Sequence, residues 1–324
     1  MGTSRAVPGE RLSATGLGTA EVTGTVLATA SRRWVVVGSL LVGVAVAVLW
    51  SFEFVDQTIG GTVADTLLGY DAAGSVIAGS GAAALFAFVS GMAGTFTACN
   101  IAAFAAVAPM VGQERSAGRR MLVLLRPLGW LAVGMLAVSA TYGAVGVLLG
   151  DRLPQLSTAT TTAGMPVRLV QSTVVFGIIG AVLTWLGLAA VGVVADPLAG
   201  LRRRFRPVDA VVLGALIGAF LVGRPFGLFF KLFRYAADHG DPLYGAGVFA
   251  LQSVGNVVVL AAVFVVLVVA GRGRLVRWLG QQPQRAARLT GAGLLVAGAF
   301  TFVYWVVRVP ALFGYGWFPT MPWQ

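Results

Sequence analysis

Long apolar segments separated by short polar connections dominate this sequence. A helix that crosses a bilayer needs about 20 apolar residues. The segments of this length lie at residues 34–52, 75–111, 127–149, 167–195, 209–236, 244–270 and 289–310. Of the 324 residues 57% are hydrophobic and 11% charged, so one soluble domain of this size cannot bury the apolar surface. The sequence therefore predicts an all-α polytopic membrane helix bundle with about seven transmembrane helices.

Basic residues lie in alternate connections and indicate the orientation of the chain. Because an excess of arginine marks the cytoplasmic side of a membrane protein, these connections are expected inside. They contain Arg32, Arg33, Arg115, Arg119, Arg120, Arg126, Arg202, Arg203, Arg204, Arg206, Arg272, Arg274, Arg277, Arg285 and Arg288. The other connections contain Glu53, Asp56, Asp65, Asp71, Asp151, Asp238 and Asp241. We expect a multi-pass protein of the plasma membrane with a cytoplasmic N-terminus and a C-terminus outside the cytoplasm.

Composition divides the chain into four expected regions. Residues 1–31 are polar and lack a sustained period, which predicts a mostly disordered cytoplasmic tail. Residues 32–74 are expected to form the first transmembrane helix and an outer loop, and residues 75–310 a six-helix membrane domain. Residues 311–324 are rich in aromatic side chains, glycine and proline, which is typical of a belt at the outer membrane interface.

Several functional classes are disfavoured by composition alone. The net charge of +11 is spread over the basic connections, so the lipid bilayer, and not nucleic acid, is the expected partner. One cysteine, Cys99, and one histidine, His239, exclude an intrachain disulfide and a multi-histidine or multi-cysteine metal centre. Motifs for nucleotides, zinc proteases and serine hydrolases are absent from the sequence, so we expect no cofactor. Whether the chain is an enzyme stays open.

A polar stretch interrupts the second apolar segment. The segment is longer than a crossing requires, so it is either strongly tilted or bent near this stretch, which contains Thr95, Thr97, Cys99 and Asn100. These residues have two interpretations. They form hydrogen bonds between helices around an inert buried thiol, or Cys99 is a reactive thiol at a helix break, with Asn100 and Thr97 beside it.

The fifth apolar segment contains the sequence Gly-Arg-Pro at 223–225. Proline removes a backbone donor and clashes with the preceding turn, so a kink or an unwound turn is predicted here. Arg224 and Lys231 are seven positions apart and would share one helix face, with Arg234 nearby. Such a basic stripe beside Pro225 predicts an anion site. Alternatively, Arg224 pairs inside the bundle while Lys231 and Arg234 reach the outer interface.

The sixth apolar segment carries two amides one turn apart. Gln252 and Asn256 lie on one helix face, and either could face Arg224. Small residues also recur at four-residue spacing, as in Ser90 with Gly94 and Gly214 with Gly218, which lets helix backbones approach closely. This spacing favours a compact bundle and does not indicate a substrate.

Two stretches together resemble the transmembrane domain of the cytochrome c biogenesis family (CcdA/DsbD type). One is FVSGMAGTFTACN at 88–100, and the other runs from GRPF at 223–226 to DPLYGAGVFALQSVG at 241–255. The resemblance implies two inverted three-helix halves within 75–310, preceded by one extra N-terminal helix. It places Cys99 at the first of two relay cysteines. Phe226 stands where the second belongs, and the prolines that flank the first are absent here.

Three functions follow from these features as alternatives. The family passes reducing equivalents across the membrane, so the resemblance implies thiol–disulfide or cytochrome maturation chemistry. Cys99 would then form a mixed disulfide with an extracytoplasmic thioredoxin-like or cytochrome-assembly partner. The second is a permease that moves a small anionic solute past Arg224. The third is a non-catalytic membrane subunit that scaffolds a partner.

The orientation can be tested with reporter fusions. A reporter that is active only outside the cytoplasm should work when it is fused after Asp151, Asp241 or Gln324. The same reporter should fail after Arg120, Arg204 or Arg274, because arginine-rich connections stay inside. One reversed fusion in this set would mean that a span has been miscounted.

Overall fold

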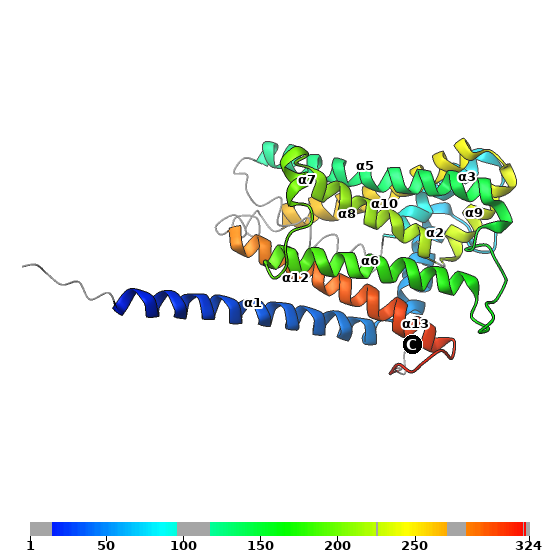
Figure 1. Ribbon diagram of the computed structural model, residues 1–324. Helices are drawn as coiled ribbons and strands as arrows, with labels where there is room; N and C mark the ends of the chain where they lie inside the picture. Colours follow the sequence, from blue (N-terminus) through cyan, green and yellow to red (C-terminus); the bar gives the residue numbers. More distant parts are fainter. Residues whose placement is uncertain (1–14, 96–116, 225, 271–282, 320, 322–324) are drawn as a thin grey trace, which may run out of the picture.

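The chain folds as a helical bundle in the computed structural model (Figure 1). The structure describes residues 15–95, 117–224, 226–270, 283–319 and 321. It is 79% helical, and the described residues form no β-strand beyond one isolated bridge between Thr160 and Pro166. The predicted all-α membrane helix bundle is therefore confirmed as a fold class.

Long helices run back and forth along the bundle, joined by short helices and turns (Figure 1). The α-helices are α1 (Thr15–Leu49), α2 (Thr62–Leu68), α3 (Gly79–Ala93), α5 (Ala117–Leu149), α6 (Val167–Val191), α7 (Ala199–Arg204), α8 (Val208–Gly223), α9 (Gly227–His239), α10 (Pro242–Ala270), α12 (Pro283–Phe302) and α13 (Val309–Leu312). Two π-helices, η1 (Glu53–Gly61) and η4 (Val303–Arg308), and a 3-10 turn, η3 (Gly150–Arg152), complete the order.

Five helical stretches are long and apolar enough to cross a membrane. They are Arg32–Leu49, Arg126–Arg152, Val167–Val191, Pro242–Val263 and Ala287–Leu312. The bent pair α8–α9 makes a sixth. Of the crossing expected at 75–111, the described residues contain only α3, which is too short to cross alone. The structure thus supports a multi-pass membrane protein with five or six described crossings.

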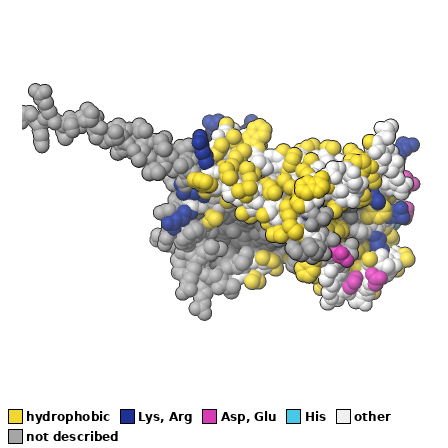
Figure 2. Space-filling model, turned by 90° about the horizontal axis from the view of Figure 1, so that it is seen from below, with side chains coloured by type: hydrophobic (Ala, Val, Ile, Leu, Met, Phe, Trp, Pro, Cys, Tyr) yellow, Lys and Arg dark blue, Asp and Glu magenta, His cyan; other side chains and the backbone are white. Residues whose placement is uncertain are grey.

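The surface of the bundle is apolar around its middle. Ile178 and Trp185 lie within α6, and 61% and 57% of their surfaces are exposed. Figure 2 shows hydrophobic side chains over the middle of one face, with acidic side chains gathered at one end and basic side chains toward both ends. Lipid is the environment that suits such a belt.

Three boundaries differ from the sequence prediction. Helix α1 begins at Thr15, so the predicted disordered tail at 1–31 is wrong for 15–31, and residues 1–14 lie outside the described chain. Once a helix has formed, each added residue forms one more backbone hydrogen bond. The helix of the first apolar span therefore extends into the polar residues before it. The expected outer loop contains η1 and α2. Helix α5 starts at Ala117, and Pro127 lies inside it.

Glycines bring four helices into close backbone contact. A Cβ at Gly91 of α3 would lie 1.8 Å from the Gln252 carbonyl oxygen of α10. On the other pair, a Cβ at Gly214 of α8 would lie 1.9 Å from the Leu131 carbonyl oxygen of α5. The predicted close approach at Gly214 is therefore present. Helix α3 packs on α10 as α8 packs on α5, and α5 also packs on α10 while α6 packs on α12.

A buried arginine ties α1 to this bundle. Arg308 lies in η4, is 2% exposed, and donates from Nη1 to the Ala47 carbonyl oxygen at 2.6 Å. Ala47 is in the last turn of α1, where carbonyl groups lack intrahelical donors. The guanidinium also lies over the Tyr304 ring, 5.1 Å from its centroid. A cation thus caps the C-terminal end of α1.

The fifth span is broken where the sequence predicted. Helix α8 ends at Gly223, and Arg224 is extended, with φ −88° and ψ 117°. Helix α9 begins at Gly227, and the axes of α8 and α9 differ by 81°. A residue before proline disfavours the helical region, which explains the extended Arg224. Pro225 itself lies outside the described residues.

The close contact between α3 and α10 can be tested with two glycines of α10. A Cβ at Gly255 would lie 2.1 Å from the Phe88 carbonyl oxygen, whereas one at Gly247 meets nothing within 4 Å. We expect Gly255→Ala to lower the free energy of unfolding by about 1–3 kcal/mol through overpacking. Gly247→Ala should be neutral or stabilising, because alanine favours helix. Thermal unfolding in detergent measures both, and equal midpoints would contradict the contact.

Candidate binding site

Arg224 is buried at the break between α8 and α9. It is 7% exposed, and its Nη1 donates to the Gly94 carbonyl oxygen at 3.2 Å. Its guanidinium carbon lies 4.6 Å from the Phe226 ring centroid and 5.4 Å from that of Phe229. Gly94 is the C-cap of α3, so the end of α3 and the break in the fifth span meet at this side chain.

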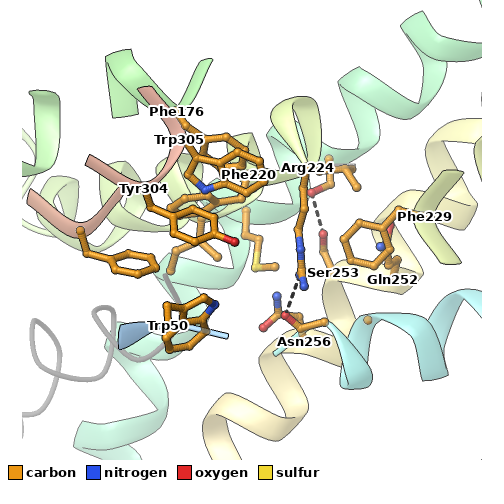
Figure 3. A pocket seen from close by; sticks show the side chains of 18 residues that line it. Trp50, Phe176, Phe220, Arg224, Phe229, Gln252, Ser253, Asn256, Tyr304 and Trp305 are labelled. Carbon is orange, nitrogen blue, oxygen red and sulfur yellow. Dashed lines mark hydrogen bonds between the residues drawn. The ribbon is translucent and has the colours of Figure 1, made fainter. Parts of the chain in front are cut away.

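A cavity of about 60 Å³ surrounds the Arg224 side chain (Figure 3). We name it the Arg224 cavity. Its polar lining includes Ser139, Arg224, Gln252, Ser253 and Asn256. Aromatic rings complete the lining, from Trp50, Phe176, Phe220, Phe229, Phe300, Tyr304 and Trp305. Phe229 lies beside Gln252, whereas Trp50, Tyr304 and Trp305 lie on the other side of Arg224 (Figure 3). Among the described lining residues Arg224 supplies the charge, and the amides and hydroxyls supply both donors and acceptors.

The polar lining residues differ in how they are satisfied. The Ser253 hydroxyl donates to Ser139 Oγ at 2.6 Å, and Thr95 Oγ1 lies 3.1 Å from Asn256 Oδ1. In contrast, Gln252 is 3% exposed and its Oε1 has no hydrogen-bond partner among the described residues. A buried amide oxygen without a partner costs free energy, so a molecule in the cavity that donates a hydrogen bond would relieve this cost.

Polar side chains satisfy the backbone carbonyl groups that the break exposes. Gln171 of α6 donates from Nε2 to the Val222 carbonyl oxygen at 2.8 Å. Ser172, its neighbour, donates to the Gly223 carbonyl oxygen at 2.5 Å. Gln155, in the connection between η3 and α6, donates from Nε2 to the Arg224 carbonyl oxygen at 3.1 Å. Three consecutive carbonyl groups are thus held by side chains.

Tyr142 links these side chains to one another. Gln171 Nε2 donates to the Tyr142 hydroxyl oxygen at 3.1 Å, and the Tyr142 hydroxyl donates to Gln155 Oε1 at 2.8 Å. The Tyr142 ring also packs edge-on against Phe233 of α9, with centroids 5.2 Å apart. We call Tyr142, Gln155, Gln171 and Ser172 the carbonyl clasp.

Lys231 does not lie with Arg224, so the predicted basic stripe is wrong. The Lys231 Nζ donates to the Ala72 carbonyl oxygen at 2.6 Å and also to that of Ser75, in the connection before α3. The reason is the break: without a continuous helix, the seven-residue spacing no longer places Arg224 and Lys231 on one face. The alternative, in which Lys231 reaches the outer membrane interface, stays a prediction.

The remaining predicted site residues are partly placed. Gln252 and Asn256 line the same cavity as Arg224. Thr97, Cys99, Asn100 and Pro225 lie outside the described residues. Helix α3 ends at Ala93, just upstream of the polar stretch where a bend was one expectation.

Sequence reasoning missed the carbonyl clasp and the aromatic side of the cavity. Gln171 lies inside an apolar span, and a polar group at that depth needs a partner, so it offered a signal. Trp50, Tyr304 and Trp305 offered none, because aromatic residues are common throughout membrane helices. Within the described residues, no group of three or more His, Cys, Asp and Glu side chains is placed to hold a metal ion.

Comparison of the chain with protein-family models, with curated proteins and with solved structures found no match.

The role of Gln252 can be separated from a structural one by two neighbouring substitutions. Gln252→Leu removes an unpartnered buried oxygen at similar volume, so without ligand the thermal midpoint should stay or rise. Ser253→Ala removes a hydroxyl that bonds Ser139, and it should lower stability by about 1 kcal/mol. Thermal unfolding in detergent measures both. If Gln252→Leu destabilised the protein as much as Ser253→Ala, Gln252 would be a packing residue.

Proposed function

We propose that this chain is a plasma-membrane permease for a small anion that carries a hydrogen-bond donor, and that the Arg224 cavity is its binding site. The observation that carries this proposal is the buried Arg224 at a broken helix, in one cavity with the unpartnered Gln252 Oε1. Broken helices at membrane depth are characteristic of transporter binding sites.

The chemistry of the lining supports this ligand class. A guanidinium donates to oxyanions in a fixed geometry, while the Gln252 oxygen accepts a hydrogen bond. A small hydroxycarboxylate or a partly protonated oxyanion offers both groups. The volume of about 60 Å³ suits a ligand of few atoms. Aromatic rings opposite Arg224 exclude water and thereby strengthen the electrostatic attraction.

The topology is part of the same proposal. By the positive-inside rule, we propose that the arginine-rich connections lie in the cytoplasm, with the N-terminus inside and the C-terminus outside. In the proposed repeat, α3 corresponds to α8–α9, α5 to α10 and α6 to α12. Under this correspondence the packing of α3 on α10 matches the packing of α8 on α5. This pattern supports two inverted three-helix units, an arrangement that transporters use for alternating access.

Arg224→Gln tests the proposed binding site. Purified protein is screened by thermal shift with lactate, bicarbonate, phosphate and sulfate, and uptake of a stabilising anion into liposomes is then measured. We expect Arg224→Gln to weaken binding about tenfold or more, because a charge-assisted hydrogen bond is lost. Arg234→Gln, which removes an exposed charge of α9, is the matched control. Equal binding by both variants would refute the site.

A second candidate function is a thiol relay with an extracytoplasmic thioredoxin-like or cytochrome-assembly partner. The contact between Arg224 Nη1 and the Gly94 carbonyl oxygen favours it. Gly94 precedes Cys99 by five residues, so this contact brings the segment before Cys99 beside the break that contains Phe226. In the family that this sequence resembles, the two relay cysteines occupy these two spans. Here a partner thiol would have to replace the second cysteine.

Cys99→Ser separates the two functions. In a permease this substitution should leave anion uptake nearly unchanged, whereas in a thiol relay it should abolish the phenotype. Mass spectrometry of Cys99 adducts trapped in native membranes would identify a partner. A silent Cys99→Ser together with no anion uptake would leave the chain as a scaffold subunit.

A further inference from the structure

A second chamber lies on the opposite side of the break from the Arg224 cavity. Its volume is about 210 Å³, and its polar lining comes from Gln155, Arg168, Gln171 and Ser172. Val222, Gly223, Gly227 and Phe230 complete its described lining, so the broken helix forms part of its wall. We call it the Arg168 chamber.

Consecutive residues at the break line one space or the other. Phe220, Leu221 and Arg224 line the Arg224 cavity, whereas Val222 and Gly223 line the Arg168 chamber. Helix α6 also contributes to both spaces within little more than one turn: Ser172 lines the Arg168 chamber, and Phe176 lines the Arg224 cavity. The two spaces are therefore separated by a thin layer of backbone and side chains.

The carbonyl clasp is the polar part of this layer. Gln155, Gln171 and Ser172 line the Arg168 chamber, and they hold the carbonyl groups of Val222, Gly223 and Arg224. The Tyr142 hydroxyl joins Gln171 to Gln155 across the layer. Gln171 Oε1 is buried and has no hydrogen-bond partner among the described residues. The bonded carbonyl groups belong to the last turn of α8 and to the extended Arg224, where helical N–H partners are lacking, so opening these bonds does not unravel a helix.

Positive charge also lines the Arg168 chamber. Arg168 is exposed and contributes a positive charge to the lining. Helix α9 begins at Gly227, which lines the chamber, and a helix N-terminus carries a partial positive charge and unpaired N–H groups. Two independent features of this space therefore favour the same ligand charge as Arg224.

We propose that the Arg168 chamber is the vestibule through which a small anion reaches the Arg224 cavity, and that the carbonyl clasp is the gate between them. This inference rests on the proposed permease function. An anion held by Arg168 and the α9 N-terminus passes inward when the carbonyl clasp releases the carbonyl groups at 222–224. The bonds re-form behind it, so the vestibule and cavity are not open to one another at rest.

Cysteine accessibility tests the gate without a solute. In a Cys99→Ser background, Phe230→Cys reports on the Arg168 chamber and Ser253→Cys on the Arg224 cavity. A membrane-impermeant sulfonate methanethiosulfonate is added from the side of the 150–166 connection. We expect Phe230→Cys to react and Ser253→Cys to be protected. A reactive Ser253→Cys, or an unreactive Phe230→Cys, would overturn the proposed arrangement.

Tyr142→Phe opens the gate while keeping the ring that packs on Phe233. It removes the hydroxyl that joins the two glutamines, and we expect the reaction rate of Ser253→Cys to rise roughly tenfold, as for the loss of one or two hydrogen bonds. Phe230→Cys reactivity in the same variant checks folding. Thr141→Ala is the matched control, since Thr141 is exposed and bonds only within its own helix. An unchanged Ser253→Cys rate in Tyr142→Phe would exclude the gate.

The charge preference of the vestibule is measured at Phe230→Cys. The thiol of Phe230→Cys should react faster with the anionic sulfonate reagent, relative to a cationic trimethylammonium reagent, than a free thiol in solution does. Arg168→Gln should lower this ratio several-fold, and an unaffected ratio would overturn the role of Arg168. Because no solute is used, these labelling rates test the vestibule and the gate. The permease function is tested separately by anion binding to Arg224→Gln.

Discussion

Backbone polar groups away from water must find partners, and this constraint shapes the centre of the molecule. In apolar surroundings each unsatisfied group is costly, so a membrane-spanning segment is normally a continuous helix. The fifth span violates this at Gly223–Phe226, where α8 stops and Arg224 is extended. The carbonyl groups of Val222, Gly223 and Arg224 are satisfied instead by Gln171, Ser172 and Gln155. The break therefore requires polar side chains from neighbouring elements at the same depth.

Close glycine packing holds those neighbouring elements in register. A Cβ at Gly223 would lie 2.8 Å from the Phe176 ring, so the end of α8 rests directly on α6. The hydroxyl of Ser172, one turn earlier on α6, then reaches the Gly223 carbonyl oxygen. On the other side, Gly91 and Gly255 let α3 approach α10, so the α3 C-terminus reaches Arg224. Steric contacts of a few glycines thus position a polar network.

Several spans and the break in the fifth could be predicted because their causes are local. Apolar length reports the cost of burying backbone in lipid, and it located α6 and α10 to within a few residues. Gly-Arg-Pro encodes the break through proline chemistry, whatever surrounds it. The start of α1 at Thr15 was missed, because helix propagation into a polar flank depends on the span that follows.

The carbonyl clasp could not be predicted, because its members are brought together only by the tertiary fold. Tyr142, Gln155 and Gln171 come from α5, from the connection after η3 and from α6, and no spacing in the sequence links them. The predicted basic stripe of Arg224 and Lys231 was wrong for a related reason. Helical phase relates Arg224 to Lys231 only along an unbroken helix, and the break that the sequence predicted invalidates the stripe that it also predicted.

The same break gives α9 mechanical independence from α8. A continuous helix resists bending because several backbone hydrogen bonds must break together. Here Arg224 and Phe226 are extended, and side chains bond the carbonyl groups of Val222, Gly223 and Arg224. The freed side chains can donate instead to water or to a passing anion, and water can donate to the freed carbonyl oxygens, so the exchange has a modest cost. In the proposed permease, a rearrangement at this point would couple occupancy of the cavity to the position of α9, because Arg224 and Phe229 line the cavity from the two sides of the break.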